Sequence, residues 1–523
     1  MQLNRSLFIS FLSVVILFSL AVPSISAQAS FQYELSEVRT LSGNGTADLK
    51  NGDLKDARYD TPSKFIKLRN GSIAIADTNN HVIRQINDKK VTTLAGSPFL
   101  IDGDIAFQGS FLDGGKLEAA FNEPAGLAIA NDGSVLIADS ANHSIRKISN
   151  DGKVTTMAGN GVFGLEDGNV KNARFNTPLD IAIDSKGNIY VADALNHVIR
   201  KISKGGIVST VTKPSDRIVE YTQGLPDFGG DFADGTIKDA MFNEPSALLL
   251  DHKDNLYVAD RGNQRIRYID FRKNTVTTVA GSGDLLTNEY YVEGGNTDGP
   301  ATKAQFSSPE GMALIDKSTL LIADRKNHTI RQLKDGIVST ITGTAEQFGN
   351  KDGLLQSALL NEPVDVLVQE DGSLLILEAG NNQIRKLATY DVFLSQKYSK
   401  KAEVWLNGKL LETTVEFIQT EPLIPLNTIG EELDLAVNYE KKSGKITLSN
   451  EKTTFVLYEN KKTAQKEELG KKASYQLNVP AKVINNKVYI PVSFISENLE
   501  LHVIWDESLK NLVIRSYIFD EKE

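Results

Sequence analysis

Residues 123–148 read EPAGLAIANDGSVLIADSANHSIRKI and determine the kind of fold that this chain adopts. The stretch contains three short apolar runs, and turn-forming residues such as Asn131 and Gly133 separate them. Short apolar runs between such turns are typical of β-strands. Nearly the same stretch, TPLDIAIDSKGNIYVADALNHVIRKI, begins at Thr177. The two copies predict a β-structure that is assembled from repeats.

The repeat occurs six times along the chain. Each copy opens at an anchoring proline (Pro62, Pro124, Pro178, Pro245, Pro309 and Pro363) and ends in an Ile-Arg pair. A fourth apolar segment accompanies each copy, at Val38, Val91, Val154, Val208, Val276 and Val338. Four antiparallel strands in each of six repeats predict a mainly β fold, a six-bladed β-propeller.

The fourth segments are displaced along the chain relative to the other three. Val38 precedes every three-strand copy, whereas the last copy ends near Leu387 and no such segment follows it. We therefore predict that residues 38–41 complete the sixth blade and join the two ends of the ring. The chain has no cysteine, so no disulfide can close the ring instead.

A motif, Ala-Asp-x-x-Asn-His-x-Ile-Arg, recurs within the copies. Its members are Asp77, His81, Arg84, Asp139, His143, Arg146, Asp193, His197, Arg200, Asp260, Arg267, Asp324, His328 and Arg331. The fourth copy has Gln264 in place of histidine, and the sixth departs most, with Glu378, Asn382 and Arg385. On these residues, the chain from about residue 38 to 390 resembles the NHL-repeat propellers.

The repeated histidine position has two interpretations. Metal ligation or base catalysis is one, but equivalent positions in successive blades lie far apart on a ring. We instead predict a structural set in which the Asp accepts backbone N–H groups at the turn between the second and third strands. The Asn there adopts the left-handed conformation, and the Arg pairs with the Asp.

Function is expected where the blades differ, in the connections from each fourth strand to the next proline. Three connections are long, at residues 96–124, 213–245 and 281–309, and all emerge on one face of the ring. Aromatic rings beside carboxylates suit peptides, sugars or cationic groups. We predict ligand contacts from Phe107, Phe111, Tyr221, Phe228, Phe232, Tyr290 and Tyr291. The alternative is that these rings hold the loops against the blades.

The mouth of the central channel is a second candidate site. Glu123, Glu244 and Glu362 immediately precede anchoring prolines on alternate blades, and Asp180 and Asp365 follow theirs by two residues. Oxygen ligands favour Ca²⁺ or Mg²⁺ over zinc or copper. The pattern therefore predicts a cation site, preferably for Ca²⁺, and the alternative is a set of separate loop acids that share no ligand.

An enzymatic role is the competing hypothesis. The resemblance brings with it six-bladed propellers that hydrolyse lactones or cleave peptidyl-hydroxyglycine with channel metals. No histidine here lies on a predicted channel strand, since His252 falls in a turn and His502 in another domain, and no Gly-x-Ser-x-Gly motif is present. A divalent-metal-dependent hydrolase or lyase at the channel mouth is thus the alternative to a binding protein.

The chain of 523 residues begins with a segment that is typical of export. Arg5 precedes an apolar run over residues 7–22, and small residues near position 28 suit a signal peptidase. We predict a signal peptide at residues 1–29, with an uncleaved membrane anchor as the alternative, and no later apolar stretch of spanning length. Acids outnumber bases 67 to 57, and the formal net charge of -10 disfavours nucleic-acid binding.

The composition changes after Leu387, and residues 391–401 read as a linker. Residues 402–518 contain VWLNGKLL from Val404, PLIPL from Pro422 and VYIPV from Val488, followed by a predicted helix at 493–498. This segment resembles the copper amine oxidase N-terminal-like, or stalk, domain of bacterial envelope proteins. It has one histidine and the chain has no cysteine, so a copper site lacks donors. The resemblance implies a spacer or attachment role.

These features predict an exported protein with an acidic propeller at residues 30–390 and a small α+β stalk domain at 402–518. We expect non-catalytic binding of a protein or carbohydrate ligand at the cell envelope or outside the cell, through the face that carries the long loops. The pattern fixes neither the identity of the ligand nor the oligomeric state.

Overall fold

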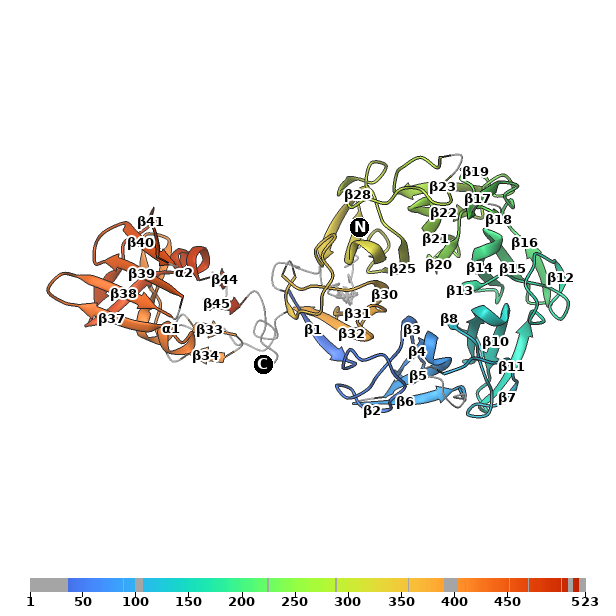
Figure 1. Cartoon of the computed structure of the whole chain (residues 1–523), viewed down its shortest axis with the longest axis horizontal. Coiled ribbons are helices and arrows are strands. Elements are labelled where there is room, and N and C mark those ends of the chain that lie inside the picture. The colour runs from blue at the N-terminus through green and yellow to red at the C-terminus, as the bar shows by residue number, and fades with distance from the viewer. Residues whose placement is uncertain are drawn as a thin grey trace, which may run out of the picture. The chain divides into compact units, whose positions relative to one another are not determined.

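The computed structural model describes residues 36–87, 89–98, 107–222, 225–286, 289–355 and 357–389, and then 403–407, 409–411, 413–450, 452–468, 470–499, 501–506 and 511–516. Within the first group of ranges, six five-stranded antiparallel sheets form the six blades of a ring. Figure 1 shows their innermost strands around its centre. The predicted mainly β fold, a six-bladed β-propeller, is confirmed.

In each blade the strand that starts at the anchoring proline is innermost, and three strands follow it outward. The innermost strands are β3 (Pro62–Lys67), β8 (Pro124–Ile129), β13 (Pro178–Ile183), β20 (Pro245–Leu250), β25 (Pro309–Leu314) and β30 (Pro363–Val368). The second strands are β4 (Ile73–Asp77), β9 (Val135–Asp139), β14 (Ile189–Asp193), β21 (Leu256–Asp260), β26 (Leu320–Asp324) and β31 (Leu374–Glu378).

The third strands are β5 (Val82–Asn87), β10 (Ser144–Ile148), β15 (Val198–Ile202), β22 (Arg265–Asp270), β27 (Thr329–Lys334) and β32 (Gln383–Thr389). The fourth strands are β6 (Lys90–Ala95), β11 (Lys153–Ala158), β16 (Ile207–Thr210), β23 (Thr275–Ala280), β28 (Ile337–Thr342) and β1 (Ser36–Ser42). In the first five blades, one turn of 3₁₀ helix links the second strand to the third, at Thr78–Asn80, Ser140–Asn142, Ala194–Asn196, Arg261–Asn263 and Arg325–Asn327.

Each blade also has a short fifth strand, which the sequence did not predict. These strands are β2 (Gly52–Asp53), β7 (Gly114–Gly115), β12 (Gly168–Asn169), β19 (Gly235–Thr236), β24 (Gly299–Pro300) and β29 (Gly353–Leu354). They come from the connection that precedes the blade and pair with the fourth strand on its outer edge. The connections are therefore part of the sheets. The 213–245 connection adds a separate hairpin of β17 (Ile218–Thr222) and β18 (Leu225–Phe228).

The second strands explain how neighbouring blades pack. In β4, Ile73 and Ile75 point into the apolar cluster shared with the sixth blade, whereas Ala74 and Ala76 point into the cluster shared with the second. Successive side chains of a strand face opposite sides, so the large and small residues separate onto the two faces. The small face receives bulky partners such as Phe121. The alternation of large and small side chains lets neighbouring blades pack face to face around the ring with few voids.

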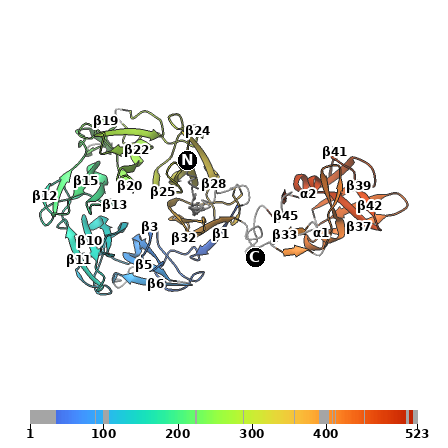
Figure 2. The ribbon, with the colours of Figure 1, turned by 180° about the vertical axis from the view of Figure 1, so that it is seen from behind.

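The N-terminal strand closes the ring as predicted. Strand β1 pairs antiparallel with β32 from Ser36 opposite Thr389 to Ser42 opposite Ile384, and with β29 on its other edge. Figures 1 and 2 show β1 beside β32 from both sides of the ring. Val38 is completely buried there. The expected closure by residues 38–41 is confirmed, and it takes place at the outer part of the sixth blade.

The C-terminal part is a separate α+β arrangement with its own apolar core. Its strands are β33 (Glu403–Leu406), β34 (Lys409–Leu411), β35 (Glu416–Ile418), β36 (Glu421–Pro425), β37 (Ala436–Glu440), β38 (Lys445–Ser449), β39 (Thr453–Tyr458), β40 (Thr463–Glu468), β41 (Lys471–Gln476), β42 (Lys482–Ile484), β43 (Lys487–Pro491), β44 (Leu501–Asp506) and β45 (Asn511–Ser516). Its helices are α1 (Leu426–Glu432) and α2 (Val492–Asn498), and α2 confirms the helix expected at 493–498.

The predicted signal peptide at residues 1–29 lies outside the described residues, as does the linker at 391–401. Among the residues that the structure does describe, no helix has both the length and the apolar character needed to cross a membrane.

Candidate ligand-binding site

A buried ion pair in each blade holds the end of the second strand. In the second blade, Arg146 Nη1 donates to Asp139 Oδ2 at 2.6 Å, and Asn142 Nδ2 donates to the same oxygen at 2.8 Å. The other oxygen of Asp139 accepts the N–H of Asn122, 17 residues earlier, at 2.7 Å. The aspartate therefore anchors the preceding connection through a backbone N–H, and it holds the following turn through the Asn142 side chain and not, as predicted, through backbone N–H groups. The equivalent acids are Asp77, Asp193, Asp260, Asp324 and Glu378.

These ion pairs remain charged at neutral pH. Burial raises the pKa of Asp77, Asp139, Asp193 and Asp324 to about 6, which leaves the carboxylates ionised at pH 7. Each arginine partner is fully buried. Removing one member of such a pair leaves an uncompensated buried charge. The set is thus a structural requirement of every blade.

The outer end of each arginine meets a further side chain that the sequence analysis missed, an aspartate in five blades and Asn51 in the first. Arg146 Nη2 donates to Asp113 Oδ1 at 2.7 Å, and Asp113 also accepts the N–H of Thr156 on the fourth strand at 3.0 Å. An Asp-Gly or Asn-Gly pair stands 33 residues before each arginine, at Asn51, Asp113, Asp167, Asp234, Asp298 and Asp352. This constant dipeptide was the available signal.

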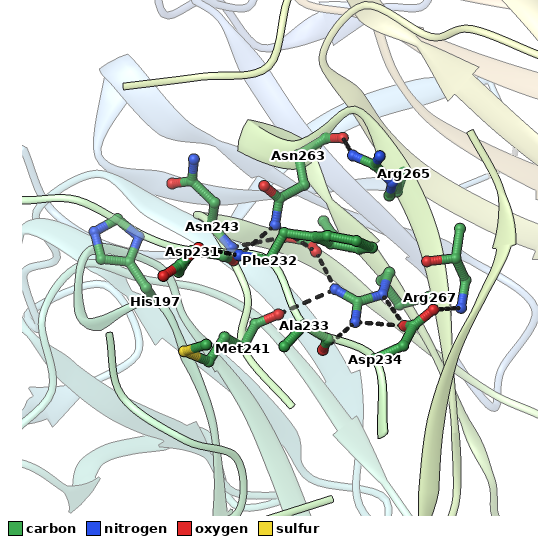
Figure 3. A network of polar contacts seen from close by, with 12 residues as sticks. His197, Asp231, Phe232, Ala233, Asp234, Met241, Asn243, Asn263, Arg265 and Arg267 are labelled. Atoms are coloured by element: carbon green, nitrogen blue, oxygen red, sulfur yellow. Dashed lines mark hydrogen bonds and ion pairs between the residues drawn. The ribbon is translucent and has the colours of Figure 1, made fainter. Parts of the chain in front are cut away.

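Figure 3 shows the polar contacts around Arg267 in the fourth blade. Arg267 lies between the rings of Phe232 and Phe242, each 4.7 Å from its guanidinium carbon. Its Nη2 donates to Asp234 at 2.7 Å. Arg265 stacks on the outer side of Phe232 at 4.1 Å. Phe232, predicted as a ligand contact, is therefore part of the blade structure.

The repeated histidines connect neighbouring blades. The N–H of Glu123 donates to His81 Nδ1 at 3.0 Å, and Thr177 N–H donates to His143 Nδ1 at 3.1 Å. Equivalent bonds run from Glu244 to His197, Ser308 to Gln264, Glu362 to His328 and Thr61 to Asn382. Each acceptor belongs to one blade, and each donor directly precedes the proline of the next. The predicted structural role is present, but its place is the boundary between blades.

The same position, and not the asparagine before it, has the left-handed backbone conformation. The φ angles are 55° at His81, 49° at His143, 55° at His197, 53° at Gln264 and 57° at His328. Because Nδ1 accepts a bond, the ring proton resides on Nε2, which lies 3.2 Å from the Phe107 carbonyl in the case of His81. Burial lowers the pKa of His81, His143 and His328, so these rings stay neutral.

The predicted aromatic residues divide into two groups. Phe111 lies 4.8 Å from the Arg146 guanidinium, Phe107 is half-buried, and Tyr290 lies edge-on to His197 with its hydroxyl donating to the Phe228 carbonyl. These contacts, like those of Phe232, hold connections in place. The rings of Phe228 and Tyr291 are exposed, as is that of Phe111, and the Tyr291 hydroxyl donates to Glu244 Oε1 at 2.7 Å. The side chain of Tyr221 lies outside the described residues.

Two further exposed aromatics come from short connections that the sequence analysis passed over. Phe163 is 64% exposed and Phe348 is 70% exposed, values that match the 64% of Phe228. Phe163 lies edge-on to His143 at 5.9 Å, and Phe348 lies at 5.8 Å from His328. Each therefore sits over a blade boundary, on the face where the innermost strands begin. Loop length was the wrong criterion for finding them.

The predicted channel acids form two separate groups. Asp180 and Asp365, on opposite blades, both approach Lys64, whose Nζ lies 3.0 Å from Asp180 Oδ2 and 3.7 Å from Asp365 Oδ1. Burial alone would lower the pKa of Lys64, but the two carboxylates raise it above its ordinary value, so the amine stays protonated. Burial raises the pKa of Asp365 to about 7. A lysine of this chain thus bridges the centre of the ring.

The second group is a chain of ion pairs along one side of the channel mouth. Arg261 contacts Glu244 at 2.6 Å and Glu310 at 3.3 Å, and Arg325 contacts Glu310 at 2.9 Å and Glu362 at 2.8 Å. Arg261 and Arg325 occupy the first 3₁₀ position after the second strands of blades four and five. The sequence analysis did not single out these two arginines.

The predicted single Ca²⁺ cluster is therefore not formed. Lysine and arginine side chains occupy the positions beside Asp180, Asp365, Glu244 and Glu362, whereas Glu123 is exposed at the surface. Over the described ranges, no group of three or more His, Asp or Glu side chains is arranged to hold a metal ion.

A pocket at the channel mouth lies between these two groups and has a volume of about 170 Å³. All six blades contribute to its lining, which consists of Thr61, Pro62, Ser63, Lys64, Thr78, Ala125, Leu179, Asp180, Ser246, Ala247, Arg261, Glu310, Gly311, Arg325, Val364 and Ala379. Its lining includes Lys64 and Asp180 of the first group and Arg261 and Arg325 of the second. The exposed aromatics lie on the same face, because the pocket and the blade boundaries both adjoin the starts of the innermost strands.

Comparison with known families agrees with this geometry. Residues 121–148 and 175–202 match the NHL repeat. The ring is a propeller that contains NHL repeats, and it is called the NHL propeller hereafter. The two matched copies contain the Asp139–Arg146 and Asp193–Arg200 ion pairs, and the other four blades of the NHL propeller repeat those contacts.

Several curated proteins align with this chain over part of their length. SUPPRESSOR OF QUENCHING 1, chloroplastic, of Arabidopsis thaliana is 30% identical over 286 residues, which is 53% of this chain and 26% of that protein. Human NHL repeat-containing protein 2 is 28% identical over 297 residues, which is 52% of this chain and 40% of that protein. The chain therefore spans less than half the length of these relatives.

Among solved structures, an auxiliary nutrient binding protein from Bacteroides ovatus aligns with a TM-score of 0.48 and 15% identity, over 68% of this chain and 77% of that one. Residues 405–514 match the copper amine oxidase N-terminal domain, which confirms the resemblance noted for the C-terminal part. The donors there do not fit copper, since His502 is the one histidine of that segment.

Proposed function

We propose that the NHL propeller is a binding module for a protein or carbohydrate ligand at the cell envelope or outside the cell, and that it binds on the face around the channel mouth. The observation that carries this proposal is the set of strongly exposed aromatic rings, Phe163, Phe228 and Phe348, on the face that also has the pocket. Exposed aromatic surface beside a polar pocket is typical of recognition sites.

The location and the role of the C-terminal domain belong to the same proposal. The apolar segment at residues 7–22 supports export, and the copper amine oxidase N-terminal domain after the propeller supports a spacer or attachment role. In this arrangement, the propeller at residues 30–390 carries the ligand site. The domain at 402–518 keeps the propeller at a distance from its point of attachment.

The test removes the aromatic surface without changing the blades. The full chain and its Phe163→Ser/Phe348→Ser variant are compared for co-sedimentation with isolated cell-wall polysaccharide and for capture of proteins from culture fluid. The matched control is Ile207→Ser/Ile337→Ser, which removes two comparably exposed apolar side chains. Ile207 begins β16 next to the end of β15 that is remote from His197, so the control lies on the opposite face.

We expect the aromatic variant to lose at least tenfold in binding to one ligand class, while the control retains it. Equal binding by the wild-type chain and both variants would refute the proposed face. Equal loss in both variants would point to non-specific adhesion of exposed apolar side chains and would also count against it. Thermal unfolding of each variant confirms that the blades remain intact.

A further inference from the structure

The innermost strands contain an approximate twofold repeat that the blade count does not require. The residues two positions after the anchoring prolines are Lys64, Gly126 and Asp180 in the first three blades, and Ala247, Gly311 and Asp365 in the last three. Blades one and four are thus equivalent in this arrangement, as are blades three and six. The two halves differ at one place, where Lys64 corresponds to Ala247.

Hydrogen bonds confirm the equivalence of the two aspartates. Asp180 Oδ2 accepts the N–H of Leu248, the residue after Ala247, at 2.9 Å. Asp365 Oδ2 accepts the N–H of Phe65, the residue after Lys64, at 3.2 Å. Each aspartate therefore reaches into the blade that follows it and aligns its carboxylate with that innermost strand.

The glycines make this approach possible. A Cβ atom on Gly126 would lie 2.5 Å from the Asp180 Cα and 2.9 Å from its Oδ1, and a Cβ on Gly311 would overlap the Asp365 carboxylate. Neither glycine has a positive φ, so the reason for glycine is space. The two carboxylates are consequently held at fixed positions around the channel.

One lysine contacts two carboxyl groups at this centre. Lys64 supplies one positive charge for the carboxylates of Asp180 and Asp365. Asp180 is 2% exposed, and its Oδ1 has no hydrogen-bond partner among the residues that the structure describes. A buried carboxylate oxygen without a donor is costly, and a cationic donor compensates it best.

The position that would supply the second cation faces the pocket. Ala247 is the twofold equivalent of Lys64 and has a methyl group where the first blade has a lysine side chain. Ala247, Asp180 and Gly311 all line the channel-mouth pocket. Its volume of about 170 Å³ is comparable to that of a cavity that holds a benzene-sized group, so it accepts a small group of a ligand.

We propose that the pocket binds a primary ammonium group of the ligand at Asp180, beside Ala247. This inference rests on the proposed function and names the chemical group that the binding face recognises. The group is available both in proteins, at a lysine side chain or a chain terminus, and in amino sugars. Capture of a single amine in a polar recess is a known mode of recognition.

The experiment measures the group itself with small probes on the full chain. Binding of 1-butylammonium and of the neutral 1-butanol is followed by ligand-detected nuclear magnetic resonance. Nα-acetyl-lysine methylamide, alaninamide and glucosamine form further arms, with N-acetylglucosamine as the neutral partner of the last. We expect 1-butylammonium to bind at least tenfold more tightly than 1-butanol. The ammonium probe that binds best then identifies the source as protein or amino sugar.

Two variants test the position. Ala247→Lys places an ammonium of the chain at the equivalent position and should reduce 1-butylammonium binding at least tenfold while leaving Asp180 unchanged. Asp180→Asn should reduce it similarly. The matched control, Asp254→Asn, removes an exposed carboxylate that bonds Ser185 in a remote turn and should bind as the wild type does.

Equal binding of 1-butanol and 1-butylammonium, or full binding by the Ala247→Lys variant, would overturn the inference. Either result leaves the aromatic face to be judged by its own variants, because the Phe163→Ser/Phe348→Ser pair does not touch Asp180. In the converse outcome, the wild-type chain binds 1-butylammonium selectively while the Phe163→Ser/Phe348→Ser variant binds polysaccharide and protein as well as the wild type does. That result would support the ammonium site and contradict the proposed face.

Discussion

The backbone N–H of Thr177 donates a 3.1 Å hydrogen bond to Nδ1 of His143, across the boundary between the second and third blades. The donor belongs to a residue with positive φ that precedes a proline, and the acceptor residue also has positive φ. Two unusual backbone conformations are therefore joined by one side chain. Six such junctions hold adjacent blades together around the ring.

Replacing His143 with glutamine should cost less than 1 kcal/mol, whereas leucine should cost about 1–3 kcal/mol because it leaves the Thr177 N–H without an acceptor. Gln264 already makes the equivalent bond, accepting the Ser308 N–H at 2.6 Å. The free energy of unfolding in denaturant measures both variants. A glutamine variant as unstable as the leucine variant would show that the bond is not the reason for histidine.

Acid should weaken the same junctions. Burial lowers the pKa of His81, His143 and His328, so below the ordinary value of about 6.5 the unfolded chain takes up protons that the folded chain does not. The contribution of these histidines to stability is then complete above pH 6.5 and decreases as the pH falls. Each histidine contributes at most about 1.4 kcal/mol per pH unit.

The control for this prediction is the variant His81→Gln/His143→Gln/His328→Gln. The buried carboxylates titrate in the same way in both proteins, so their contribution cancels in the difference. The unfolding free energy of the wild type should fall relative to that of the variant between pH 6.5 and pH 5. A constant difference across that range would contradict the assignment of neutral rings.

Adding a methyl group at Gly311 or Gly126 should destabilise the ring by about 1–3 kcal/mol per site, because the new Cβ meets the Asp365 or Asp180 of the next blade. Gly205→Ala is the control, since its Cβ would have Ser203 Oγ at 3.8 Å as nearest neighbour and its φ is not positive. Thermal and denaturant unfolding measure all three. If the control costs as much as the other two, close approach at the channel is not the cause.

Deleting Ser36–Ser42 should abolish the single cooperative unfolding transition of the propeller, because the deletion removes β1 from between β32 and β29. Inserting the same seven residues after Thr389, behind an Asn-Gly turn, should restore the transition, since the strand then follows β32 as the fourth strand follows the third in other blades. Removal of residues 1–29 is the control and should leave the melting temperature unchanged. Failure of the inserted strand to rescue would mean that its covalent position matters more than its pairing.

The sequence predicted what depends on constant spacing along the chain. The six blades, the displaced β1 and the Asp139–Arg146 pair all follow from residues that recur at fixed intervals. Contacts between blades depend on how the ring closes in space, so the bond from Thr177 to His143 was assigned to the wrong place. The same limitation applies to Lys64, whose two carboxylates come from blades that only a closed ring brings together.

Other misses came from the criterion and not from the physics. Phe163 and Phe348 were visible in the sequence, but loop length directed attention to longer connections whose aromatics, such as Phe232, turned out to stack on arginines. Asp113 was not singled out, and Asp-Gly pairs usually mark a turn. Its constant distance of 33 residues from Arg146 would have distinguished it.

The pairing of Ser36 with Thr389 also determines the order in which the protein can fold. Most other strand pairs join segments within one blade, whereas this pair encloses about 350 residues and gives the fold a contact of very high sequence separation. A chain still in synthesis remains an open arc with an unpaired strand edge, which another chain can join. Completion of the last blade is therefore the folding step that closes the ring. A chain truncated before Thr389 should instead form oligomers in which β1 of one chain pairs with another chain.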